Sequence, residues 1–416
     1  MIEAIRNAFK IPDLRLKILF TLFIIGIYRL GAHIPVPGVD LAALKQLFSE
    51  GGGILGLLDL FSGGALSNFA VFALGIMPYI TASIIMQLLT VVIPTLERWK
   101  QEGEMGQRKI TQTTRYMTLG LAVVESAGYS LFFQAQLGIT FSLLERYLIV
   151  ITLTAGTAMV MWLGELITQR GIGNGMSLMI FASIIAGMPQ GIVSTFQAVN
   201  PVVAVAFFIF IILLLIAIVV MEGGQRRIPV QYAKRVVGRR VTSGGSTYIP
   251  LKLNSAGVIP IIFATSVLLV PITLSTYFPG SFFKSMEQAF QAGAPVRMIT
   301  QSVLIVFFAY FYTAIVFNPI ELSDNIKKYG GFIPGVRPGK PTAVYLDRVL
   351  NRITLPGSIF LAFIAVVPDV MGANLGIPFL SNFGGASLLI MVGVGLETMK
   401  QLESQLMQRH YEGFLK

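Results

Sequence analysis

The chain has 416 residues, of which 54% are apolar and 12% are charged, and its mean hydropathy is +0.75. A soluble domain carries about a quarter charged residues, so this composition excludes an ordinary water-soluble protein and predicts a polytopic membrane protein. The chain has no cysteine, which excludes disulfides, thiolate metal sites and cysteine nucleophiles. His33 and His410 are far apart in the sequence, so we expect no histidine-bound metal or haem, and no cofactor.

Crossing a bilayer takes about 20 apolar residues, and ten segments meet or approach that length. They are residues 16–32, 69–93, 116–137, 147–168, 172–193, 201–221, 255–275, 299–318, 354–371 and 377–396. The fifth, ninth and tenth are weaker because they are short or are broken by Gly, Pro or Asn. The sequence therefore predicts ten membrane spans.

The Lys and Arg residues test this count, because cytoplasmic loops carry an excess of positive charge. With ten spans, 26 of the 31 Lys and Arg residues fall on one side of the membrane and 5 on the other. One missed or extra span would mix the two sides and remove the asymmetry. We therefore predict that both termini are cytoplasmic.

A short pattern occurs twice in the chain, as ALGIMPYITAS at 73–83 and AGVIPIIFATS at 256–266. Aligning Gly75 with Gly257 matches Pro78 to Pro260. Each copy lies in the second span of a half of five spans, which divides the chain into 1–198 and 199–416. Halves with an odd number of spans run in opposite directions through the membrane, as in the inverted repeats of many transport proteins. Chance similarity between two apolar runs is the alternative.

The repeated prolines predict interrupted helices at the centre of the protein. A proline removes a backbone hydrogen bond, and in hydrocarbon the freed group is tolerated only beside protein or a water-filled cavity. We expect Pro78 and Pro260 to face inward. Ile76 and Ile80 lie four residues apart on one helix face, and Ile262 matches Ile80 in the repeat. Branched apolar side chains around a passage would form a hydrophobic constriction; lipid-facing isoleucines are the alternative.

The stretch before the second span, GGGILGLLDLFSGGALSNFA at 51–70, contains an apolar part too short to cross a membrane. Glycines bound it on both sides. It predicts a re-entrant segment that folds back into the protein from the external side, or else a plain external loop.

Two basic cytoplasmic loops, 222–254 and 318–352, have turn-forming sequences. The first alternates apolar and polar residues around the Gly pair of TSGGST, which predicts a β-hairpin. The second has Pro and Gly around Arg337, which predicts a rigid turn that presents a cation. Such patches suit a nucleic-acid-rich or acidic protein partner, although any cytoplasmic loop tends to be basic.

Motifs of catalysis are missing from the sequence. It has no HExxH, no GxSxG and no Walker loop, and RGIGNG at 170–175 opens a span rather than a nucleotide-binding unit. Carboxylates within the spans are few, with Glu125 the most central. This counts against an intramembrane enzyme and against an ion-coupled transporter, which would usually need more than one buried carboxylate.

Six stretches, in chain order, resemble the bacterial SecY family of protein-translocation channels and extend from about the first span to the tenth. They are FIIGIYRLGAHIPVPGVD, LFSGGALSNFAVFALGIMPYITASIIMQLLTVVIPTLE, WLGELITQRGIGNGMSL, GQRRIPVQYAKR, STYIPLKLNSAGVIPIIFA and FNPIELSDNIKKYGGFIPGVRPG. The motifs are long and keep their order, so the similarity is specific.

The resemblance implies an all-α membrane protein with ten helices in two inverted five-helix halves around an hourglass pore. It implies a passive channel for unfolded secretory proteins, with a side gate that releases membrane segments into lipid. By the matching motifs the pore ring consists of Ile76, Ile80, Ile180, Ile262 and Ile390. The plug is the stretch 54–66, with Ile54, Leu55, Leu57, Leu58, Leu60 and Phe61. Met77 and Met179 are alternative neighbours of the ring.

The resemblance also implies a lateral gate near Gln87, Glu125 and Asn254. Glu125 departs from the family, in which an amide is more familiar at that position, so the polar contacts of the gate are in question. Arg239, Arg240 and Arg337 would receive the SecA ATPase or the ribosome.

The implied partners are the small membrane subunits SecE and SecG, SecA, the ribosome, an unfolded preprotein with its signal peptide, and the lipid bilayer. The implied location is the bacterial cytoplasmic (inner) membrane. A secondary transporter of a small solute is the alternative function.

Overall fold

The structure is a computed structural model that describes residues 6, 9–37, 59, 62–137, 141–232, 235–237, 240–242, 246–277, 280–290, 294–375, 377, 379 and 383–414. Its helices are α2 (Pro12–Gly31), α5 (Met77–Val92), α6 (Pro94–Gln101), α7 (Glu104–Leu137), α8 (Leu143–Arg170), α9 (Gly175–Ala198), α10 (Pro201–Gly223), α11 (Ile259–Tyr277), α12 (Ser281–Ala289), α13 (Pro295–Val316), α14 (Pro319–Lys328), α15 (Lys340–Leu375) and α17 (Gly385–Phe414). Each of the ten predicted spans overlaps one of these helices.

Several of these helices can cross a membrane by length and composition. Among the described residues, six are long and apolar enough alone, and α5 with α6 makes a seventh if this bent pair is one span. The helix α10 is the most apolar, with a mean hydropathy of 3.6, and it exposes Val202, Leu213 and Val220 on its surface. A helix with apolar side chains on its outer face belongs in lipid, so the chain is a multi-pass membrane protein.

The repeated prolines do not interrupt helices, contrary to our expectation. The helices begin at Met77 and Ile259, so Pro78 and Pro260 are the second residues of α5 and α11. The first turn of a helix has no acceptor for its N–H groups, and proline loses nothing there. Both prolines are buried, as expected. The predicted span 69–93 is helical only from Met77, and the chain bends by 98° between α5 and α6.

The last predicted span is also shifted. The helix α17 begins at Gly385, eight residues after the predicted start, and continues to Phe414. Its first residue is glycine because a Cβ at this position would lie 1.7 Å from the carbonyl oxygen of Ile364 in α15. The close approach of the two helix backbones therefore fixes where α17 packs.

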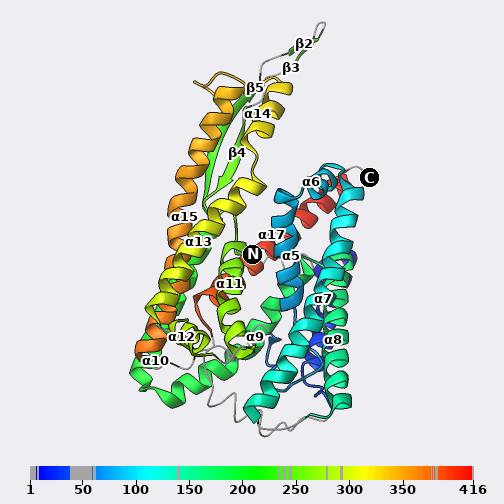
Figure 1. Ribbon diagram of the computed structural model, residues 1–416. Helices are drawn as coiled ribbons and strands as arrows, with labels where there is room; N and C mark the ends of the chain where they lie inside the picture. Colours follow the sequence, from blue (N-terminus) through cyan, green and yellow to red (C-terminus); the bar gives the residue numbers. More distant parts are fainter. Residues whose placement is uncertain are drawn as a thin grey trace.

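The helices pack in two groups that α9 and α17 join (Figure 1). In one group α7 contacts both α5 and α8, and in the other α13 contacts both α11 and α15. The helix α9 contacts α8 and α17, and α17 contacts α10 and α15. The largest hydrophobic cluster includes residues of both groups and of α9 and α17.

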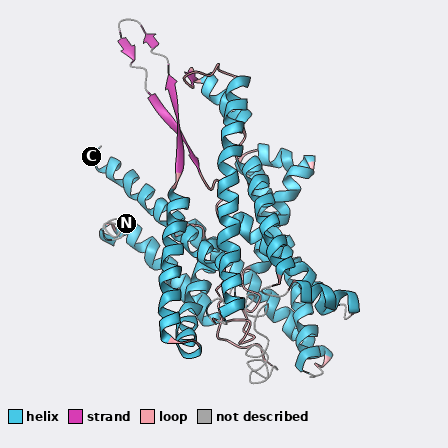
Figure 2. Cartoon of the chain, turned by 90° about the vertical axis from the view of Figure 1, so that its left-hand side faces the viewer, coloured by secondary structure: helices cyan, strands magenta, loops and turns pink. Residues whose placement is uncertain are grey.

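The two basic loops form one small unit, which we call the loop unit, outside the helical bundle (Figure 2). Its strands are β1 (Gln225–Tyr232), β2 (Arg235–Val237), β3 (Arg240–Thr242), β4 (Ser246–Lys252) and β5 (Gly331–Phe332). The predicted hairpin is present: β1 pairs with β4 and β2 pairs with β3, both antiparallel and in one register. The pair Val237 and Arg240 brackets the reversal, so the chain turns earlier than we expected from the Gly pair 244–245, which lies outside the described residues.

The second basic loop docks on the first, which the sequence did not predict. The strand β5 adds to β1, giving a sheet of order β4-β1-β5. Ile228 and Leu251 of the hairpin are buried with Ile326 of α14 and Leu346 and Leu350 of α15. The two loops therefore share a sheet and a hydrophobic core.

Candidate pore, gate and docking surface

The five isoleucines of the predicted ring come from four separate segments and belong to, or pack against, the largest hydrophobic cluster. Ile76, Ile180 and Ile390 are 2%, 4% and 1% exposed, and the partly buried Ile80 and Ile262 pack against the same cluster. None of the five lies on an outward face of the bundle, unlike the exposed isoleucines of α10. This burial disfavours the lipid-facing alternative for Ile76, Ile180 and Ile390, and the ring itself stays a prediction.

The helix α9 is held in place from its first residue. The side chain of Asn174 caps it by accepting hydrogen bonds from the backbone N–H groups of Met176 and Ser177, at 3.0 and 3.3 Å. Gly175 allows the start of α9 to approach α8, because a Cβ there would lie 1.9 Å from the carbonyl oxygen of Gly164. The sequence GIGNG therefore caps the start of α9 and brings it against α8. In this way it positions Ile180, which lies five residues after Gly175 in α9.

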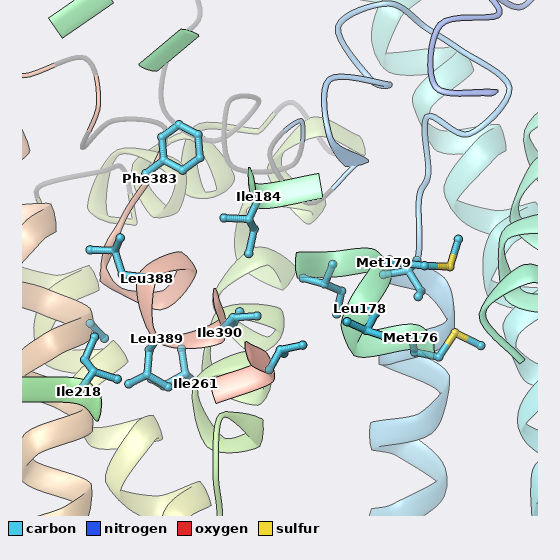
Figure 3. Close-up of a cluster of buried hydrophobic side chains, with 14 of the residues drawn as sticks. Met176, Leu178, Met179, Ile184, Ile218, Ile261, Phe383, Leu388, Leu389 and Ile390 are labelled. Carbon is cyan, nitrogen blue, oxygen red and sulfur yellow. The ribbon is translucent and has the colours of Figure 1, made fainter. Parts of the chain in front are cut away.

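Ile184 is a residue that the sequence reading missed. It follows Ile180 by four residues, on the same face of α9, and is 1% exposed in the same cluster. Figure 3 shows Ile184 of α9 and Ile390 of α17 in the same buried cluster. The i, i+4 spacing was the available signal.

Met179 faces a different neighbour. In Figure 3 its side chain points away from Ile390. A Cβ on Gly164 of α8 would lie 3.4 Å from the Met179 sulfur and 2.5 Å from that of Met176. Both methionines therefore fill the contact between α8 and α9.

The three predicted gate residues differ in their surroundings. Gln87 of α5 is exposed, Glu125 of α7 is half-buried, and Asn254, just before α11, is 6% exposed. The Asn254 amide donates hydrogen bonds to the Glu222 carboxylate at 2.5 Å and to the carbonyl oxygen of Gly257 at 2.9 Å. These bonds connect the segment after β4 to the end of α10 and to the residues before α11. All three residues belong to the half 199–416, so neither bond joins the two halves.

An ion pair within the bundle joins α7 to α8 and was not predicted. The guanidinium of Arg115 donates from Nε and Nη2 to the two carboxylate oxygens of Glu165, both at 2.7 Å. The side chains are 34% and 18% exposed. Such a two-point contact fixes orientation as well as distance, so α7 is bound to α8 as one unit.

The predicted plug lies mostly outside the described residues, including Ile54, Leu55, Leu57, Leu58, Leu60 and Phe61. Its end is described as a turn organised by Asp59. The Asp59 carboxylate accepts a hydrogen bond from the N–H of Ser67 at 2.8 Å, and its carbonyl oxygen accepts from the N–H of Gly64 and the hydroxyl of Ser62, both at 2.9 Å. Burial raises the pKa of the Asp59 carboxyl, and the hydrogen bonds from Ser67 and Ser62 oppose that shift.

Two of the three predicted docking cations, Arg240 and Arg337, lie on the loop unit. Arg337 is exposed in the turn between β5 and α15, and its carbonyl oxygen accepts a hydrogen bond from the Thr342 hydroxyl at 2.8 Å. Arg240 begins β3, whereas Arg239 lies outside the described residues. A turn that exposes Arg337 is therefore present, as expected.

Comparison with known proteins gives matches over the full chain. The family model SecY matches residues 70–399. The protein translocase subunit SecY of Streptomyces galbus is 52% identical over 442 aligned residues, covering 100% of both chains. The protein of the same name from Mycobacterium tuberculosis (strain CDC 1551 / Oshkosh) is 48% identical, also with 100% of both chains covered.

Solved structures share the fold at lower identity. A structure described as a protein conducting channel is 20% identical, with a TM-score of 0.64 over 93% of this chain and 91% of the other. Sec61 in the canine ribosome–channel complex from the endoplasmic reticulum is 18% identical, with a TM-score of 0.61 over the same shares. The helical architecture is thus that of these channels, and by sequence the chain belongs to the SecY family.

Proposed function

We propose that this chain is the central channel subunit of a Sec translocase, a passive pore for unfolded secretory proteins and for insertion of membrane proteins. Relatives about half identical over their full length carry the name protein translocase subunit SecY, and such relatives give no support to a solute transporter. The observation that carries the proposal is the meeting of five isoleucines from four separate segments in one apolar cluster.

The proposed ring works because it has no polar group. Apolar side chains offer neither ions nor peptide groups a hydrogen bond, so a narrow apolar waist excludes water and ions at rest. The same side chains can close around any polypeptide, since they read no sequence. A sufficiently apolar segment that reaches the side opening enters lipid, a transfer favoured by about 25 cal/mol per Å² of apolar area.

The proposed halves are residues 1–198 and 199–416, with the lateral gate between α5 and α7 on one side and α11 and α13 on the other. Gln87, Glu125 and Asn254 would line this gate. The helices α9 and α10 meet at the proposed boundary, since α9 ends at Ala198 and α10 begins at Pro201.

Both termini would face the cytoplasm of a bacterial cell, and the channel would lie in its inner membrane. The loop unit, formed by 222–254 and 318–352, would lie on the cytoplasmic side. With Arg239, Arg240 and Arg337 it would receive SecA or the ribosome. Its shared core supports this role, because a rigid surface loses little conformational entropy on docking. The stretch 54–66 would be the plug, and SecE and SecG the small membrane partners.

Conductance across a planar bilayer tests the ring. Replacing Ile76, Ile80, Ile180, Ile262 and Ile390 by serine should make the resting channel leak ions, because hydroxyls would hold water at the waist. The matched control carries serine at Ile209, Ile212 and Ile216 of α10, whose side chains are about half exposed on the outer face of this helix. This variant channel should not leak ions. Equal, unchanged conductance in both variants would contradict the proposal. A transporter would instead show saturable uptake that changes at Glu125 abolish.

A further inference from the structure

The side chain of Tyr28 joins three segments that lie far apart in the sequence. It is 1% exposed near the end of α2, and its ring stacks on Phe72 with centroids 5.9 Å apart. Its hydroxyl donates to the carbonyl oxygen of Ser62 at 3.2 Å and lies 2.8 Å from the hydroxyl of Ser183 in α9. One phenol therefore connects α2, α9 and the turn that precedes α5.

The hydroxyl hydrogens fit this arrangement. When the Tyr28 hydrogen goes to Ser62, the phenol oxygen can accept the hydrogen of Ser183. Ser183 can instead turn its hydrogen to the carbonyl oxygen of Met179, 3.0 Å away in its own helix, and accept that of Tyr28. A switch between the two patterns makes or breaks the bond to Ser62 without moving a side chain.

Arg29, the next residue, holds the same turn from a second point. Its Nη1 donates to the carbonyl oxygen of Gly63 at 2.5 Å. Gly63 has a φ of 69°, and a Cβ there would lie 3.1 Å from the Cα of Ser183 and 2.8 Å from Arg29. Only glycine fits in this position, so the backbone of the turn lies directly against α9.

The contacts lie beside the segments that carry the ring. Ser183 is adjacent to Ile184 and three residues after Ile180, and the chain runs from the turn through a series of short turns to Ile76. Any displacement of α9 from the turn therefore has to break one of the two bonds of the Tyr28 hydroxyl, to Ser62 or to Ser183, while the Arg29 bond keeps the turn on α2. Buried polar groups that lose their partners are costly in apolar surroundings, so these bonds favour the arrangement in which the segments are together.

We propose that Tyr28 is a positioning residue for the resting channel: its hydroxyl holds the turn at 62–64 against α9 and so keeps the isoleucine ring closed. Arg29 supports this role by binding the carbonyl oxygen of Gly63, which holds the same turn on α2. The proposal rests on the proposed channel function and adds to it which bonds must break when the ring opens.

The test is Tyr28→Phe in the full chain, which removes the hydroxyl and keeps the ring stacked on Phe72. We expect the resting conductance in a planar bilayer to rise about fivefold, the population change for a hydrogen bond worth roughly 1 kcal/mol. We also expect greater export of a preprotein whose signal segment has a shortened apolar core, because less binding energy is needed to open the channel. Tyr310→Phe is the control, since Tyr310 also donates to a backbone carbonyl but from an exposed position, and both readouts should stay at the wild-type level.

A second variant keeps the test decisive. If Tyr28→Phe does not accumulate in the membrane, Ser183→Ala removes the other hydroxyl and should raise the resting conductance in the same way. Wild-type conductance and wild-type signal dependence in a folded variant, together with a leaking serine ring, would overturn the role of Tyr28 and leave the channel function standing. If the serine ring also fails to leak, the channel function itself is contradicted.

Discussion

Gly75 and Gly257 have nearly the same backbone conformation, with φ of 55° and 62°. Each glycine lies two residues before the start of a helix. The second residue of that helix is proline, Pro78 in α5 and Pro260 in α11. Residues with a side chain rarely adopt such φ values, so the shape of the chain at this point requires glycine. The repeated pattern is thus a repeated helix start, and it supports the division of the chain into two related halves.

This relationship predicts the effect of alanine at Gly257. A Cβ there would meet no atom within 4 Å, so the cost is backbone strain alone, about 1–2 kcal/mol. Gly257→Ala should lower the thermal unfolding midpoint in detergent. Gly223→Ala is the matched control, because it too has open space around it but lies at the end of α10 without a positive φ. Equal midpoints for the two variants would show that the conformation at Gly257 is not required.

The Arg115–Glu165 pair predicts non-additive substitutions. Arg115→Met and Glu165→Met should each destabilise the protein, because each leaves the partner's charge half-buried without a counter-charge. The double variant should be more stable than either single one. A double-mutant cycle by thermal unfolding measures the coupling.

The same helix offers a control for this cycle. Arg108 and Glu104 form an ion pair at 2.9 Å with side chains 75% and 83% exposed. An exposed pair contributes about 0–1 kcal/mol, so Arg108→Met should change the midpoint little. Additive effects at Arg115 and Glu165 would mean that their contact does not bind α7 to α8.

The turn around Asp59 should lose stability as the pH rises. Because burial raises the pKa of its carboxyl, the folded turn binds the proton more tightly than the unfolded chain does. The stabilisation is complete below the ordinary carboxyl pKa of about 4 and decreases as the pH passes through the raised value. Hydrogen exchange at the Ser67 amide, corrected for the intrinsic rate, should show protection that falls over this range.

Asp59→Asn is the control for this pH dependence, because it keeps an oxygen acceptor for Ser67 and removes the charge. Its protection should be the same at each pH. Protection that increases with pH in the wild-type chain would mean that hydrogen bonding to the carboxylate outweighs its burial.

Much of the architecture was predictable because bilayers impose strong rules on sequence. Each of the ten apolar segments overlaps a helix, and the alternating pattern of the loop 222–254 predicted the hairpin. The start of α17 was missed, because the contact of Gly385 with Ile364 depends on packing that apolarity does not reveal. The docking of β5 on β1 was missed for a similar reason, since a two-residue strand has no periodicity of its own.

Some residues of the candidate site could likewise be predicted from the sequence, and others could not. Ile76 and Ile80 could be proposed from spacing, whereas Ile180 and Ile390 came from family resemblance and have no local signal. The Arg115–Glu165 contact and the bonds of Tyr28 join residues 50 and 155 positions apart. Long-range polar contacts of this kind need the folded structure.

Crosslinking of a stalled secretory preprotein tests the central claim most directly. The chain has no native cysteine, so single cysteines at Ile80, Ile262 and Ile390 can be compared with cysteines at Ile209 and Ile212 on the outer face of α10. We predict that the first three crosslink to the translocating segment and the last two do not. Crosslinks of equal yield at both sets, or at the α10 positions alone, would contradict a polypeptide path through the isoleucine ring.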